Sequence, residues 1–320
     1  MLKYFLIQQF KIARKYFQKK TLAKTITSIL FVLTLLFMAY GLYEFFSAGF
    51  RYIAREKVIF YPLSLYFYEM FFLILGGIIF FSTFVIGMFS LWKGGNDNWI
   101  IASPSYSYLP KFIFIKSIIN GLWPLFVIVL PTVLALNRVF DLSLLGMILI
   151  LVSFALFLSL ISALALLTIV LIAYLFYQLS RKIKFLKFNF KTLIVALILV
   201  IIGSASFIWQ HSVSIDFVKL FKADQAEAVS IELSSVADIF FYLPSHPMAM
   251  NTLYWQMHSG VQASKYFLIL LAMTILLSSL WFLSSRLFLP LWQILQENRS
   301  GQTKTGHLRH FFNFKPAKER

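Results

Sequence analysis

Residues 142–180 read LSLLGMILILVSFALFLSLISALALLTIVLIAYLFYQLS and contain no charged side chain. A run of this kind is typical of a membrane-spanning helix, which needs about 20 apolar residues. At about 1.5 Å per residue, a single helix of this length exceeds a ~30 Å hydrocarbon core. No Pro or Gly-Asn turn divides the run, however, and two short spans would place the five basic residues of 181–191 outside. We therefore predict one long helix within 142–178 that protrudes into the cytoplasm.

The composition of the whole chain indicates the same environment. Of 320 residues, 60% are hydrophobic and 13% are charged, and the mean hydropathy is +0.81. A soluble domain could not bury so much apolar surface, since about half apolar is the norm. The net charge of +17 is explained by basic cytoplasmic segments, so we expect no nucleic-acid partner. The absence of cysteine excludes disulfides and thiolate metal sites.

We predict an all-α polytopic membrane protein with six transmembrane helices. An amphipathic interfacial helix is expected before them, because residues 3–20 place apolar and basic side chains on opposite helical faces. No cleavable signal peptide is expected in this N-terminal segment, residues 1–24. The six predicted spans are 26–46, 67–91, 112–136, one helix within 142–178, 192–209 and 266–288.

The distribution of basic residues predicts the orientation of these spans. With the N-terminus inside, 22 Lys and Arg residues lie in cytoplasmic segments and 7 in external ones. We therefore expect both termini in the cytoplasm. A small external helical segment is predicted between spans five and six, at 210–264, with a helix within 217–242 that LPSHP (243–247) ends. A basic cytoplasmic tail follows at 289–320.

The sequence offers little chemistry of its own. The order GxxxxGK[ST] of a phosphate-binding loop is absent, so the chain alone is not expected to hydrolyse ATP. We predict no catalytic, cofactor-binding or metal-binding residues. The histidines predicted outside, His211, His246 and His258, have no metal-ligand spacing and are expected to be solvated or interfacial.

Two acids at the membrane edge are candidates for function, because ionisable groups at membrane depth are rare. Glu44 ends the first predicted span and Glu69 begins the second. They are expected to meet each other or one of three nearby basic residues, and interfacial pairing is favoured over proton coupling. Those basic residues are Arg51, Arg55 and Lys57.

The third predicted span contains residues that can kink a helix. They are Asn120, Gly121, Pro124 and Pro131.

The stretch between the second and third spans, GGNDNWIIASPSYSYLPKFIFIKS (94–117), is either a returning loop or a docking site. Gly94 to Asp97 predict a turn with helix N-cap candidates, and Ser103-Pro104 would end a short helix. Trp99, Ile100 and Ile101 are expected to face lipid or a partner protein.

This stretch resembles the cytoplasmic loop of permeases of the type-two (ABC-2-like) class of ABC exporters. The resemblance lies in the order of a basic residue, an Asp, bulky apolar residues, Ser-Pro, an aromatic residue and a Lys. The layout of the spans is also similar to that family. The matching residues are Lys93, Asp97, Trp99, Ile100, Ile101, Ser103, Pro104, Tyr108 and Lys116.

The resemblance implies a permease subunit in a bacterial inner (plasma) membrane. The loop 92–111 would dock on a separate ATPase subunit, which would use the ATP and Mg²⁺, and a second permease copy or paralogue would complete the complex. The membrane lipid would surround the spans. The cargo would be amphipathic or lipid-like, since the predicted spans have little polar lining.

Two other functions remain open from the sequence. An ATP-independent secondary transporter or channel would need Glu44 or Glu69. An integral membrane enzyme would depend on Ser or His residues on one side of the membrane.

Overall fold

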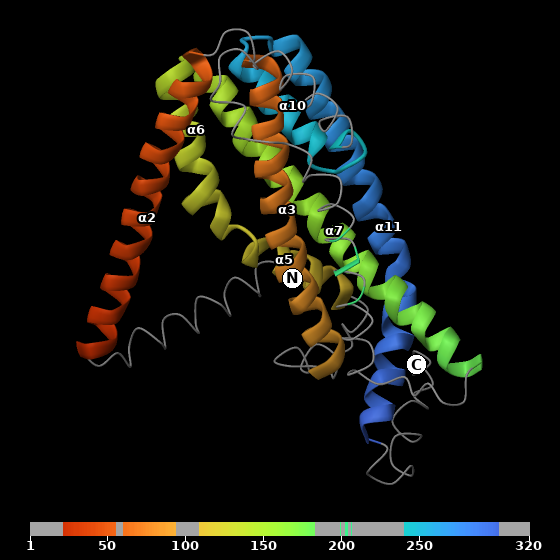
Figure 1. The fold of residues 1–320 in the computed structure, drawn as a ribbon. Helices are drawn as coiled ribbons and strands as arrows, with labels where there is room; N and C mark the ends of the chain where they lie inside the picture. The colour runs from red at the N-terminus through yellow and green to blue at the C-terminus, as the bar shows by residue number, and fades with distance from the viewer. Residues whose placement is uncertain are drawn as a thin grey trace, which may run out of the picture.

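The computed structural model describes residues 22–55, 60–93, 109–182, 199, 202–203, 206 and 240–300. Within this part of the chain, the residues form helices, turns and short connections, and none is assigned to a strand. Figure 1 shows how the helices are arranged. The elements are α2 (Leu22–Arg55), α3 (Phe60–Lys93), α5 (Leu109–Asn120), the π-helix η3 (Leu125–Val129), α6 (Leu130–Phe140), α7 (Leu144–Lys182), α10 (His246–Gln256) and α11 (Gly260–Ser300).

Five helical segments are long and apolar enough to cross a membrane, and they confirm the prediction of a helical, membrane-embedded protein. These segments are Ile26–Arg55, Phe60–Met88, Pro110–Phe140, Leu144–Leu175 and Gly260–Ser284. The predicted count of six is not confirmed, because span 192–209 falls outside the described residues except for four positions. The predicted helix at 3–20, residues 217–239 of the predicted helix 217–242 and the tail beyond residue 300 also lie outside the described part. Residues 289–300, which were predicted to belong to the tail, continue α11.

The boundaries of the first span differ from those expected. Its predicted end was residue 46, whereas α2 continues to Arg55. The prediction ended the span soon after Glu44. A charged residue at a membrane surface does not interrupt backbone hydrogen bonding, so the helix continues past it.

The uncharged run that begins at residue 142 forms a single helix from Leu144, as predicted. α7 has 39 residues, which corresponds to about 58 Å. Its central side chains, Phe154, Phe157 and Leu158, are fully buried. α7 is thus the central element against which α3 and α11 pack.

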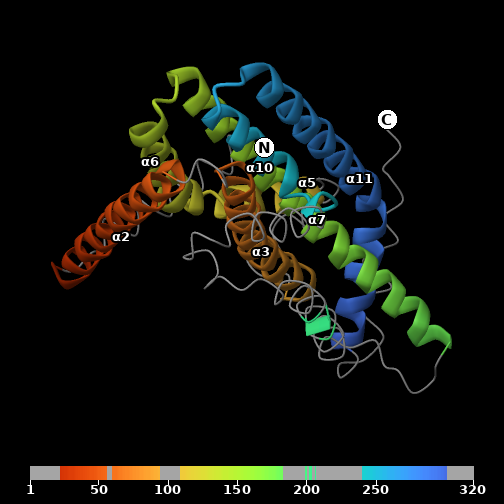
Figure 2. The ribbon, with the colours of Figure 1, turned by 45° about the horizontal axis from the view of Figure 1, so that its top comes forward.

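The helices form a closely packed group and one diverging helix. α3, α7, α10 and α11 lie together, whereas α2 leans away from them and meets α6 near the end of the molecule where α10 lies (Figures 1 and 2). We call this the α10 end. α7 and α11 both begin there and run to the opposite end (Figure 1).

The third span is interrupted, as its Gly and Pro residues predicted. α5 ends at Asn120, a turn follows at Gly121 and Leu122, and η3 precedes α6. Pro124 lies directly before η3, and Pro131 lies in the first turn of α6. A proline lacks the N–H that an α-helix interior uses, so the backbone adopts other hydrogen-bond patterns here.

Candidate functional site

Glu69 lies fully buried on α3, at the α10 end of the bundle. Its Oε1 is 2.6 Å from Nδ1 of His246, and its Oε2 accepts a hydrogen bond of 3.4 Å from the hydroxyl of Ser245. His246 is the first residue of α10 and its side chain is 10% exposed. A carboxylate removed from water needs such partners, because burial without them carries a large free-energy penalty.

The positions of Glu69 and His246 correct two expectations. Glu69 was expected to meet Glu44 or a basic residue of the segment 51–57, and His246 was expected to be solvated or interfacial. Instead the two side chains pair in the interior. Sequence spacing did not reveal the pair, because its members lie 177 positions apart.

Aromatic rings surround the imidazole of His246. The ring of Phe241 lies 5.1 Å from it and that of Tyr266 lies 6.1 Å from it, centroid to centroid. Tyr254 stacks on Tyr266 at 5.6 Å. Apolar ring surface therefore lies beside the imidazole and limits its contact with water.

α10 is buried along nearly its whole length, and its polar residues contact three different helices. The hydroxyl of Tyr68 on α3 donates to Oε1 of Gln256 at 2.6 Å. Asn251 accepts a hydrogen bond from Ser153 on α7 at 3.2 Å. Its amide nitrogen donates to the carbonyl oxygen of Ala263 on α11 at 2.8 Å. α10 thus joins three membrane-length helices through polar contacts.

The sequence determines locally where α10 begins and how closely it packs. Turn hydrogen bonds link Leu243 to Phe240 and His246 to Leu243, and Pro247 occupies the first helical turn, where a missing N–H is harmless. The LPSHP segment therefore leads into a helix, whose first two residues are His246 and Pro247, and α10 itself was not predicted. Trp255 lies so close to α7 that a Cβ at Gly146 would be 2.9 Å from its Cε3.

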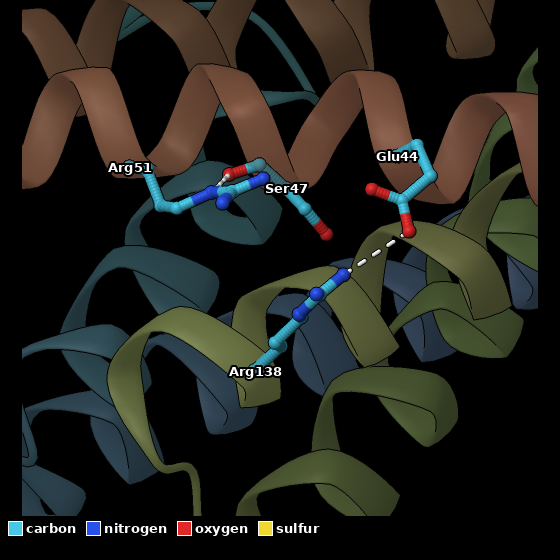
Figure 3. Close-up of polar contacts among 4 residues, drawn as sticks. All are labelled: Glu44, Ser47, Arg51 and Arg138. Atoms are coloured by element: carbon cyan, nitrogen blue, oxygen red, sulfur yellow. Dashed lines mark hydrogen bonds and ion pairs between the residues drawn. The ribbon is translucent and has the colours of Figure 1, made fainter.

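Glu44 takes a different partner from those expected. Its Oε1 lies 3.1 Å from Nη1 of Arg138 on α6, and both side chains are partly exposed (Figure 3). Arg138 also lies over the ring of Tyr43 at 5.5 Å. Arg51 donates instead to the backbone carbonyl of Ser47 on its own helix (Figure 3). The two membrane-edge acids therefore belong to separate contacts, one between α2 and α6 and one between α3 and α10.

Most of the predicted coupling loop lies outside the described residues. Lys116 lies on α5, where its Nζ is 5.8 Å from the centroid of Phe112. The other residues predicted for this site lie outside the described part of the chain; they are Asp97, Trp99, Ile100, Ile101, Ser103, Pro104 and Tyr108.

Sequence reasoning missed the polar residues of α10 and their partners. Tyr68, Ser153, Asn251 and Gln256 were not predicted as site residues. The signal available was the presence of Asn251 and Gln256 in the otherwise apolar segment between two aromatic-rich stretches. Among the described residues, no three His, Asp or Glu side chains are grouped so that they could hold a metal ion.

Comparison with known proteins gives one match. A family model described as "Putative ATP-binding cassette" matches residues 19–315. No curated protein matches the chain, and no solved structure matches it either.

This match corrects two predictions. The chain was expected to be a permease of the type-two exporter class and to have no ATPase role of its own. Both are contradicted, because the matched family is described as an ATP-binding cassette and the match covers nearly the whole chain. The sequence reasoning took nucleotide binding only from GxxxxGK[ST], an order that the matched residues lack. The chain belongs to the putative ATP-binding cassette family and is a membrane-embedded component of an ABC system.

Proposed function

We propose that the chain is the membrane-embedded component through which an ABC system moves a substrate across the membrane with the use of ATP. One observation carries this proposal. The residues that match the ATP-binding cassette family, 19–315, include the five helices of membrane-spanning length in the described part of the chain. One polypeptide thus combines a match to a family described as a putative ATP-binding cassette with long apolar helices in its described part.

The proposed substrate is amphipathic or lipid-like. The support comes from the polar side chains within the described spans, many of which are already engaged in contacts between helices. Glu69, Tyr68 and Ser153 each bind a residue of α10. The lipid-facing surface is apolar, with large exposed side chains on α2 such as Phe37 at 75% exposure.

The proposed partners are an ABC ATPase subunit, a second copy or paralogue of this chain, and the surrounding lipid. The ATPase would dock on the loop 92–111, where Trp99, Ile100 and Ile101 are costly to leave in water. ATP and Mg²⁺ are the proposed cofactors of the assembled system.

The proposed topology has six crossings of a bacterial cell membrane and both termini in the cytoplasm. α7 ends at the opposite end of the molecule from the start of α11 (Figure 1). The chain between the end of α7 and the start of α11 must therefore cross the membrane an odd number of times. Residues 192–209 are apolar enough for one crossing. Leu199 and Ile202 within this run are helical and exposed, at 65% and 55%.

Purification of the tagged chain from native membranes in mild detergent tests the proposed function. We expect ATP hydrolysis to co-purify with the chain, together with an ABC ATPase subunit. A variant with Trp99, Ile100 and Ile101 replaced by Ser should insert normally and lose the partner. The proposal is wrong if neither ATPase activity nor labelling by a photoreactive ATP analogue accompanies the wild-type chain.

A second candidate function, ATP-independent transport coupled to protons, is favoured by one observation. Glu69 and His246 form a buried ionisable pair within the helical bundle, and such pairs often belong to proton pathways. This candidate predicts transport that an ionophore abolishes and that ATP depletion leaves unchanged at constant membrane potential.

A further inference from the structure

The third span changes its hydrogen-bond pattern over a short segment. The N–H of Gly121 is shared between the carbonyl oxygens of Ser117 and Ile118, at 2.9 and 3.1 Å, and Leu125 bonds back to Leu122. Residues 125–129 then form a π-helix before α6 resumes the α-helical pattern. Short π-helical segments inside α-helices often occur at functional sites and mark places where a helix can bend.

The segment before this interruption packs within the main group of helices. Ile113 on α5 is fully buried, and it belongs to an apolar cluster with Phe84 on α3, Leu166 on α7 and Trp281 on α11. α5 is therefore held by three long helices. We call the assembly of α3, α5, α7, α10 and α11 the core.

The segment after the interruption packs against α2. α6 and α2 share the Glu44–Arg138 contact and the contact between Phe50 and Phe140, whose rings lie 6.2 Å apart. We call α2 and α6 together the arm.

The arm meets the core at the α10 end through aromatic side chains. Phe46 on α2 contacts Phe67 and Phe71 on α3 at 6.2 and 5.5 Å, and Phe50 contacts Tyr68 at 6.2 Å. The remainder of α2 diverges from the core in both views (Figures 1 and 2). Large side chains along that remainder are exposed, including Leu30, Phe31, Leu36 and Phe37 at 57–75%.

We propose that residues 121–129 are a hinge on which the arm swings relative to the core, with the aromatic contacts at the α10 end as its pivot. Three features support this: the changed hydrogen-bond pattern of residues 121–129, the packing of α5 against the core while α6 packs mainly against α2, and the divergence of α2. Each group also has its own polar contact, Glu44–Arg138 in the arm and Glu69–His246 in the core.

The hinge deepens the proposed function and rests on it only for the ATP-driven force that would move it. α5 directly follows the loop 92–108 in the chain, so a force applied to that loop by an ATP-driven step would reach the hinge through α5. The arm would then move relative to the core. The existence of the hinge itself does not require ATP, which makes it testable separately.

Spin-label distance measurements on the full chain in lipid nanodiscs test the hinge. The chain contains no cysteine, so pairs of cysteines can be introduced at exposed positions without background labelling. One pair lies within the arm (Phe37 and Leu134), one within the core (Ile74 and Leu171), and one links arm and core (Phe37 and Leu171). All four positions are exposed.

Without nucleotide, we expect a broad or two-peaked distance distribution for the arm–core pair and narrow distributions for the other two pairs. The double variant Pro124→Ala/Pro131→Ala regains two N–H donors, so its arm–core distribution should become narrower. The matched control Pro110→Ala, in the first turn of α5, should leave the width unchanged. The proposal would be overturned if the arm–core distance distribution of the wild-type chain were as narrow as the distributions of the pair within the arm and the pair within the core. Absence of both ATPase activity and labelling by the photoreactive ATP analogue would refute the proposed function and leave this result standing.

Discussion

The carboxylate of Glu69 lies 2.6 Å from the imidazole of His246 and joins α3 to the first residue of α10. Because both groups are shielded from water, each depends on the other as its hydrogen-bond partner. The short helix α10, which is enclosed by three long helices, is therefore positioned by a polar contact as well as by apolar packing.

Replacement of Glu69 by Ala should destabilise the protein by about 1–3 kcal/mol, because the buried Nδ1 of His246 would lose its hydrogen-bond partner. Thermal unfolding in detergent measures the change. The control is Glu44→Ala, since the Glu44–Arg138 pair is partly exposed and screened by water, so little change is expected. Equal effects of the two substitutions would show that the buried pair has no special structural role.

Replacement of Asn251 by Leu should destabilise the junction of α10, α7 and α11. The variant loses two hydrogen bonds, and the buried carbonyl oxygen of Ala263 loses a donor, which costs about 1–3 kcal/mol. Ser153→Ala removes one of the two bonds and should have the smaller effect. Limited proteolysis of the α10–α11 connection, alongside unfolding, measures both. If the Asn251→Leu variant were as stable as the wild type, the stabilising role of these two hydrogen bonds would be contradicted.

Substitution of Gly146 by Ala should destabilise the packing of Trp255 on α7 by about 1–3 kcal/mol. The added Cβ would lie 2.9 Å from the indole ring, closer than van der Waals contact permits. Gly77→Ala is the matched control, because its Cβ would meet nothing within 4 Å and alanine favours the helix by up to about 1 kcal/mol. Trp fluorescence and unfolding midpoints distinguish the two variants. If Gly146→Ala and Gly77→Ala had equal effects on stability, the close packing of Trp255 against Gly146 would be contradicted.

Reporters fused at residues 186 and 230 test whether the chain crosses the membrane between α7 and α10. The proposed sixth crossing at 192–209 predicts a cytoplasmic signal at 186 and an external signal at 230. Paired phosphatase and fluorescent-protein fusions give opposite readouts at each site. The same signal at both positions would refute the crossing.

The long apolar helices could be predicted from sequence, because length and hydropathy are properties of contiguous residues. The uncharged run became α7 as predicted, and Gly121 and Pro124 marked the break in the third span. The pairing of Glu69 with His246 could not be predicted in this way, since it depends on how distant helices pack. α10 escaped detection because it has 11 residues, too few for a span, and carries polar groups on several faces. The ABC system was inferred correctly, but the permease class was inferred wrongly, because a layout of spans and one loop are features that unrelated membrane proteins can share.

The central claim is that ATP use moves the membrane helices of this chain. Spin labels at Phe37→Cys and Leu171→Cys, measured in native membranes containing the assembled system, test it most directly. Mg²⁺-ATP with vanadate should shift the arm–core distance distribution relative to a nucleotide-free sample, while the Ile74–Leu171 distribution stays constant. An unchanged arm–core distribution in membranes that demonstrably hydrolyse ATP through this system would contradict the claim.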